Sequence, residues 1–210
     1  RLAAMSAPQN TAARSPARAI QAVLLLGHDP LSGGWNRPAG SPADWLRLRQ
    51  DPDGGMTLFG FGAADPTSTA LSISALLGRP AGAPAVAPAV RSGVMWLHGR
   101  QTPEGGFAPE GGIADVEMTL ETVYALAGAQ ALDTPPSTGH PSTLSYLAAY
   151  APRATALDLG RLIIAVVALG GDPRQINDDD LVARLESLYN PASGAYGSPV
   201  PDHAWALLAL

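Results

Sequence analysis

Carboxylate and hydroxyl side chains are the groups in this sequence best suited to acid–base or nucleophilic chemistry. Glu117 and Glu121 are spaced to share one face of a helix, where they would resemble the carboxylate pair of a glycoside hydrolase. Glutamates in a first helical turn also interact favourably with the helix dipole, which is the simpler explanation. Three serines, Ser68, Ser72 and Ser74, have no histidine–carboxylate companion in the sequence, so nothing favours a serine hydrolase.

Two further acidic positions need a separate interpretation. The cluster Asp178-Asp179-Asp180 follows Asn177 and precedes the segment 181–188, which predicts a capped helix whose dipole the carboxylates complement. Of the four histidines, we single out His203, which is adjacent to Asp202. We interpret His203 as a surface or capping residue, because its neighbours do not have the spacing of metal ligands.

The composition excludes several classes of protein. The chain has no cysteine, which rules out disulfides, thiolate nucleophiles and cysteine-ligated zinc. Its 13 basic residues are all arginine, and a net charge of -5 without a basic run predicts that it does not bind nucleic acid. The longest apolar run, 162–169, is too short to span a membrane. We also expect no metal and no cofactor.

The elements that must position these residues are repeated. Residues 45–55 read WLRLRQDPDGG, and the same pattern returns at residues 96–106 as WLHGRQTPEGG. Tyr146-Leu147 begins a more divergent copy. One aspartate follows each turn in a similar frame, which predicts one shared helix-capping role for these four residues: Asp65, Asp115, Asp158 and Asp202.

Each copy predicts two helices. One is amphipathic, with exposed arginines and with Trp45, Trp96 or Tyr146; the other, as at 69–77 or 162–169, is almost wholly apolar and must be buried. We expect five buried inner helices and four outer ones. A flexible tail is predicted for residues 1–14, followed by one helical domain over 15–210 in which Ser15 caps the first helix.

The turn Gln-x-Pro-acid-Gly-Gly, preceded by an aromatic–leucine pair, resembles the prenyltransferase and squalene oxidase repeat of the terpenoid cyclase and protein prenyltransferase superfamily. The resemblance implies an all-α fold, an α/α toroid, here a partial ring with inner and outer helix layers. The sequence stops inside the helix that Asp202 opens. We therefore expect further repeats in a longer protein, or a homodimer, to cover the last apolar hairpin.

The resemblance implies chemistry that this chain matches only in part. Cyclases use an Asp-x-Asp-Asp acid, and protein prenyltransferases hold zinc with aspartate, cysteine and histidine. Here Asp115 and Glu117 occupy the aspartate and cysteine positions and His203 lies near the histidine position, so the zinc thiolate site cannot form. Tyr124 and Trp205 are the aromatic candidates on inner helices, where such rings would stabilise a carbocation. Arg161 would face the mouth of the ring as an anion contact.

The interpretation we favour is a non-catalytic α/α-toroid module that binds an apolar or amphipathic ligand, such as an isoprenoid-like molecule, or a protein partner. We expect it in a bacterial surface or secreted protein. A divergent terpenoid cyclase or prenyltransferase is the alternative, and corrinoid binding, which transcobalamin-like rings perform, also stays open. No catalytic residue is assigned. The predicted ligand-binding residues are Asp115, Glu117, Tyr124, Arg161, Asp202, His203 and Trp205.

Overall fold

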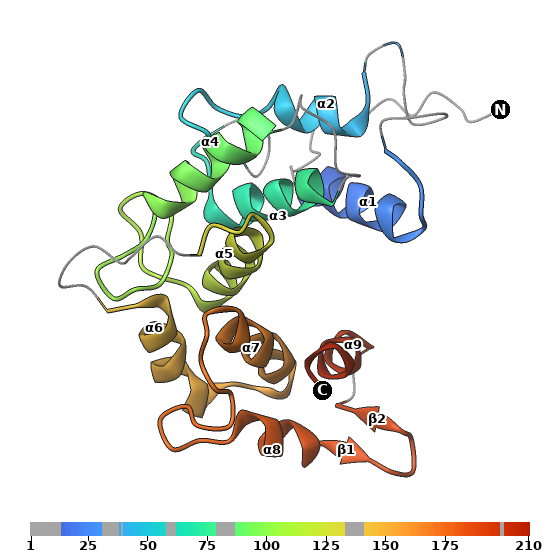
Figure 1. The fold of residues 1–210 in the computed structure, drawn as a ribbon, viewed down its shortest axis with the longest axis vertical. Coiled ribbons are helices and arrows are strands. Elements are labelled where there is room, and N and C mark those ends of the chain that lie inside the picture. The colour runs from blue at the N-terminus through green and yellow to red at the C-terminus, as the bar shows by residue number, and fades with distance from the viewer. Residues whose placement is uncertain are drawn as a thin grey trace.

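A computed structural model of the chain describes residues 14–30, 38, 40–57, 62–78, 87–132, 141–197 and 200–210. This part is all-α, as predicted, apart from one short hairpin (Figure 1). Its helices are α1 (Arg14–Leu25), α2 (Pro42–Arg47), α3 (Pro66–Leu77), α4 (Ala87–His98), α5 (Val116–Gly128), α6 (Thr143–Tyr150), α7 (Ala156–Ala168), α8 (Leu181–Glu186) and α9 (Val200–Ala209). A short 3₁₀ turn, η2 (Ala151–Arg153), follows α6, and the hairpin pairs β1 (Tyr189–Asn190) with β2 (Ala195–Tyr196).

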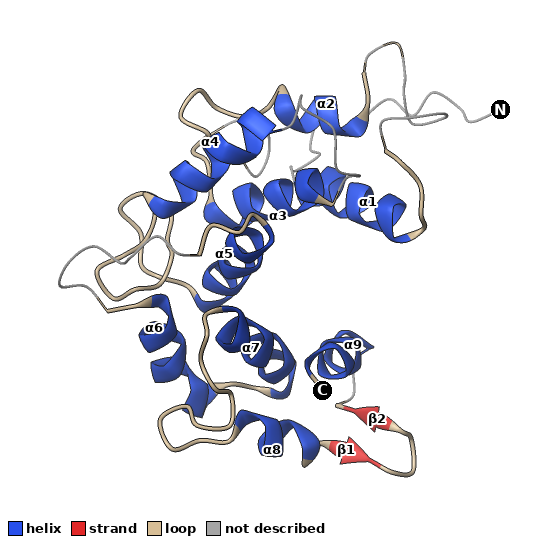
Figure 2. Ribbon diagram, viewed as in Figure 1, coloured by secondary structure: helices blue, strands red, loops and turns tan. Residues whose placement is uncertain are grey.

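The helices form two layers. In Figures 1 and 2 the helices α1, α3, α5, α7 and α9 make a curved inner row, and α2, α4, α6 and α8 lie along its outer side. Each inner helix packs on the next along the row. Trp45, Trp96 and Tyr146 lie on the outer helices α2, α4 and α6, as predicted. The described helices therefore give the five inner and four outer positions expected from the sequence.

Burial explains why the inner helices are apolar on nearly every face. In α3, the side chains of Leu71, Ile73 and Leu76 are each at most 3% exposed, and in α7 Leu162 and Val166 are fully buried. Burying one such side chain contributes about 1.5–3 kcal/mol. The inner row is consequently held together mainly by helix-to-helix apolar packing.

The turns at 50–56 and 101–107 make the same contacts. The side chain of Gln50 donates to the backbone of its own turn at 2.9 Å and to the carbonyl of Ala89 in α4 at 2.8 Å. Gln101 donates to its own turn at 3.2 Å and to the hydroxyl of Thr143 in α6 at 3.0 Å. Each glutamine therefore ties an outer-to-inner turn to the outer helix that follows it.

Two glycines let these turns lie directly against an aromatic ring. A Cβ on Gly55 would lie 2.7 Å from the ring of Trp96, and one on Gly106 would lie 2.8 Å from the ring of Tyr146. The preceding Gly105 has a φ of 91° and would place a Cβ 2.5 Å from the carbonyl oxygen of Ser142. Larger residues at these positions would push the outer helices away from the turns.

The aspartates do not share one role. Asp65 and Asp115 are N-caps of α3 and α5, each accepting a bond from the backbone amide three residues ahead at 2.9 Å, as predicted. For Asp158 the prediction holds only in part, because Thr155 is the N-cap of α7 and the Asp158 carboxylate accepts from the Thr155 amide at 3.0 Å, completing a capping box from inside the helix. Asp202 lies in the first turn of α9, where it is buried.

The start of the first helix differs from the prediction, whereas the acidic cluster before α8 agrees with it. Of the predicted tail, residues 1–13 lie outside the described residues, and Arg14 already belongs to α1. Ser15 lies inside α1, so the prediction that it caps this helix is wrong. Asp180 is the N-cap of α8 and accepts a bond from Ala183 N at 2.8 Å, which confirms the capping role for this member of the acidic cluster.

Candidate functional site

A hollow of about 570 Å³ lies against the inner row. All five inner helices contribute to its wall, and most of the contributing side chains are apolar or aromatic. The lining residues are Arg18 and Gln21 of α1, Leu71 and Ser74 of α3, Glu121, Tyr124 and Ala127 of α5, Ile164 and Ala168 of α7, and Trp205 and Leu208 of α9. Its volume falls in the range of about 300–1,000 Å³ that is typical of small-molecule sites.

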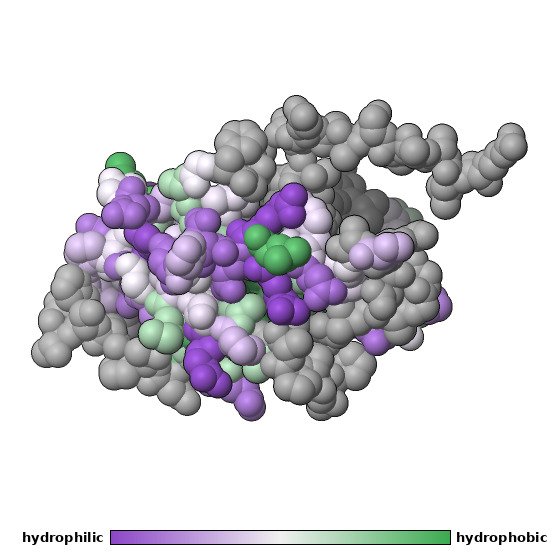
Figure 3. All heavy atoms as spheres, turned by 90° about the horizontal axis from the view of Figure 1, so that it is seen from above, coloured by the Kyte–Doolittle hydropathy of each residue, from purple (hydrophilic) through white to green (hydrophobic). Residues whose placement is uncertain are grey.

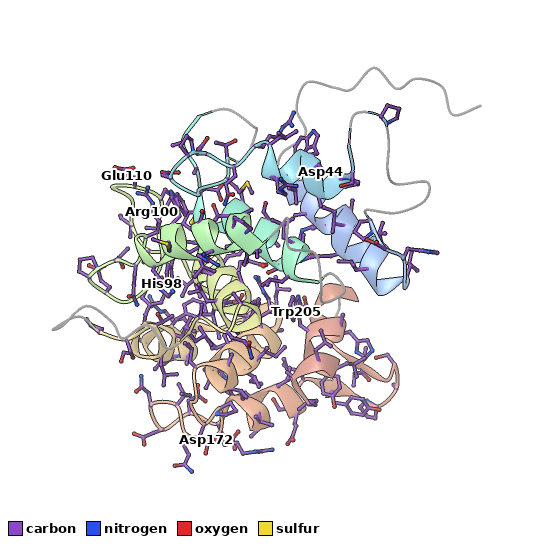
Figure 4. All side chains as sticks on the ribbon, turned by 45° about the horizontal axis from the view of Figure 1, so that its top comes forward. Asp44, His98, Arg100, Glu110, Asp172 and Trp205 are labelled. Atoms are coloured by element: carbon purple, nitrogen blue, oxygen red, sulfur yellow. The ribbon has the colours of Figure 1, made fainter. Side chains whose placement is uncertain are left out.

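Three residues of this wall form one connected group with Arg161 of α7, and we call these four residues the inner-wall cluster: Glu121, Tyr124, Arg161 and Trp205. The rings of Tyr124 and Trp205 stack, with centroids 5.7 Å apart and an interplanar angle of 19°. Arg161 places its guanidinium carbon 5.6 Å from the Trp205 ring centroid and pairs with Glu121, Nη2 to Oε1, at 2.9 Å. The hydroxyl of Tyr124 donates to the carbonyl oxygen of Arg161 at 2.6 Å. Figure 4 shows Trp205 between α9 and the rest of the inner row.

Local sequence features bring α5, α7 and α9 together. Glu121 and Tyr124 are three residues apart on α5 and therefore share a face. On α7, Gly160 precedes Arg161, and a Cβ at Gly160 would lie only 2.6 Å from the backbone of Trp205. The missing side chain thus permits a close approach of α7 and α9, which sets the Trp205 ring over the guanidinium of Arg161.

Burial controls the electrostatics of the inner-wall cluster. Arg161 is only 8% exposed, and a buried guanidinium requires a partner, which Glu121 supplies. Arg161 Nε makes no hydrogen bond within the described part of the chain. Burial raises the pKa of the Tyr124 hydroxyl well above its usual value, and the negative charge of Glu121 adds to this effect. Tyr124 therefore remains a neutral hydrogen-bond donor at physiological pH.

The remaining predicted site residues lie elsewhere. Asp115 and Glu117 are exposed at the start of α5 and do not line the hollow. Asp202 is buried in α9, and His203 Nδ1 accepts a bond from the Tyr196 amide at 3.2 Å, with the two rings stacked. The structure therefore unites Tyr124, Arg161 and Trp205 but separates them from these four. Within the described ranges, no three His, Asp or Glu side chains are grouped so that they could hold a metal ion.

Sequence reasoning did not find several residues of the wall. Glu121 was considered only as one of a carboxylate pair with Glu117, although its spacing from Tyr124 places both on one helix face. Arg18 and Gln21 have the same spacing on α1. That spacing was the available signal, but it does not show which face of a helix points into a hollow.

One face of the surface is mixed in character. On the face seen in Figure 3, hydrophobic residues of the described part form small, separate groups among hydrophilic ones. None of the helices in the described segments has the length and apolar character needed to cross a membrane. Neither the models of known protein families nor the curated proteins include a match to this chain.

Proposed function

We propose that this protein is a binding module that holds an amphipathic small molecule in the hollow of its inner helix row. The observation that carries the proposal is the composition of the wall: five helices converge on one hollow of about 570 Å³ and present to it apolar and aromatic side chains with a few polar groups. This combination is characteristic of ligand sites. A wall of Leu71, Ile164 and Trp205 favours a ligand with a substantial apolar part.

The state of the charged groups supports binding over the cyclase or prenyltransferase alternative. Glu121, the carboxylate at the wall, is engaged in an ion pair with Arg161 at 2.9 Å, so it is poorly placed to protonate an alkene. The hydroxyl of Tyr124 donates a hydrogen bond to the backbone carbonyl of Arg161. Stacking of Tyr124 on Trp205 gives the wall a fixed aromatic surface, which can pack against an apolar ligand without reordering.

We further propose that the chain is a partial α/α toroid related to the prenyltransferase and squalene oxidase repeats. The turn motif supports this relationship, and so do the matching contacts that Gln50 and Gln101 make with the outer helices that follow them. Because the same fold serves many functions, the relationship adds little to the choice of ligand.

Filling the hollow tests the binding function directly. Ala127 lines the hollow, and Ala127→Trp would occupy much of it; the matched control is Ala149→Trp, at an exposed position of the outer helix α6. Isothermal titration calorimetry with 1-dodecanol, below its solubility limit, should give saturable binding to the wild-type protein. We expect Ala127→Trp to weaken that binding at least tenfold and Ala149→Trp to leave it unchanged.

Two results would overturn the proposal. One is the absence of binding to the wild-type protein by any single-chain amphiphile, whatever its head group. The other is equal binding by both tryptophan variants, which would place the ligand outside the hollow. Native mass spectrometry of freshly purified protein adds an independent readout, since a retained ligand should be lost from Ala127→Trp only.

A further inference from the structure

From the charges around the hollow we infer that its ligand is a single-chain amphiphile with a carboxylate head, bound with the head at α1 and the tail along α5, α7 and α9. This inference rests on the proposed binding function. The lining contains two charged residues, Arg18 and Glu121. Their different surroundings decide which charge a ligand would meet.

The negative charge of Glu121 is already compensated. Its carboxylate lies 2.9 Å from Arg161 Nη2, and both side chains are mostly buried, at 12% and 9% exposed. A cationic head group would have to compete with a guanidinium fixed in place by the inner-wall cluster. The carboxylate of Glu121 therefore offers little to a cation.

The positive charge of Arg18, in contrast to the negative charge of Glu121, is not compensated within the described ranges. Arg18 is exposed, and it makes no hydrogen bond or ion pair with any residue of the described ranges. Gln21 lies on the same face of α1 and adds an amide donor at the same side of the hollow. A guanidinium presents planar paired donors that fit the two oxygens of a carboxylate. The α1 side of the hollow is thus complementary to a carboxylate anion.

The opposite side of the hollow fits the tail. Ile164 and Ala168 of α7, Leu208 of α9 and the stacked rings of Tyr124 and Trp205 give this side a continuous apolar character. A single alkyl chain lying there would remove both its own surface and these side chains from water. Head and tail would consequently occupy different helices of the inner row.

The test compares three probes of one chain length on one protein: dodecanoate, dodecanamide and dodecyltrimethylammonium, each below its micelle concentration and at low salt. Calorimetric titration of the wild-type protein should show dodecanoate binding about fivefold more tightly than the amide, the gain expected for a partly exposed ion pair. The cation should bind more weakly than the amide. Added salt should reduce the preference for dodecanoate.

Variants locate the head group. Arg18→Gln should abolish the preference for dodecanoate over dodecanamide. Arg91→Gln, an exposed position on the outer helix α4, is the matched control and should keep the preference. Equal binding of dodecanoate and amide by the wild-type protein, tighter binding of the cation, or a preference that survives Arg18→Gln would overturn the inference while the binding function stands. If none of the three probes binds while 1-dodecanol does, the inference alone fails; if 1-dodecanol does not bind either, the proposed function fails together with it.

Discussion

Replacing Gly160 by alanine sets two effects against each other at the contact between α7 and α9. Inside a helix, alanine is more favourable than glycine by roughly 0.5–1 kcal/mol. At Gly160, however, the new Cβ would lie 2.6 Å from both the carbonyl carbon and oxygen of Trp205, which are backbone atoms of α9. To restore ordinary contact α9 must move by roughly 1 Å, and such overpacking costs about 1–3 kcal/mol. We expect Gly160→Ala to lower the free energy of unfolding by about 1–2 kcal/mol.

Gly128→Ala provides the matched control. Gly128 is the last residue of α5, is exposed, and would place its Cβ 3.5 Å from Leu77 Cδ1, an ordinary contact. Urea unfolding should show no loss of stability, and a gain of up to about 1 kcal/mol. Hydrogen exchange should in addition show faster exchange of the α9 amides in Gly160→Ala alone. A Gly160→Ala variant as stable as Gly128→Ala would refute the close packing of α7 on α9.

Three further predictions concern capping, a buried hydroxyl and pH. Asp65→Ala and Asp115→Ala should each lower the free energy of unfolding in urea by about 0.5–2 kcal/mol, and a loss at only one of them would contradict their equivalent capping roles. Thr119→Val removes the hydroxyl that accepts from the Phe107 amide at 3.0 Å, so it should cost about 1–3 kcal/mol; unchanged stability would show that another group satisfies this amide. Burial, with a hydrogen bond to a carboxylate, raises the pKa of Tyr150 from 10.0 to about 12. The resulting stabilisation is complete below about pH 10 and is lost as the pH rises through 12. Tyr150→Phe should remove this part of the pH dependence of unfolding, and parallel pH profiles for the two proteins would contradict the assignment.

The sequence was sufficient to predict the helical layers. The pattern shared by residues 45–55 and 96–106 fixes where an outer helix ends and where a glycine turn begins. It correctly predicted that Trp96 and Tyr146 lie on outer helices and that Asp65 and Asp115 cap inner ones. These features depend on residues close together in the chain, which explains why the pattern alone was sufficient.

Other features were not predicted correctly, either because two residues compete for one helix-capping position or because the interacting residues are far apart in the sequence. Asp158 was expected to begin its helix, but Thr155 occupies the N-cap position, and the Asp158 carboxylate accepts from the amide and the hydroxyl of Thr155 to complete the capping box. The pairing of Arg161 with Glu121 joins α5 to α7 and depends on the angle at which these helices pack. No local pattern in the sequence specifies that angle, so the hollow and its charges were found only in the structure.

The serial arrangement of the inner helices gives the row a mechanical property. Because each inner helix packs on the next, the separation between α1 and α9 depends on every intervening joint, at α3, α5 and α7. A small rotation at each joint would add to those at the others, so the separation of the two end helices would change most. Arg18 and Trp205 lie on the two end helices. A ligand that contacts both residues would restrain the separation of these helices. If the hollow binds a ligand as proposed, bending of the row would therefore change the affinity of the hollow for that ligand.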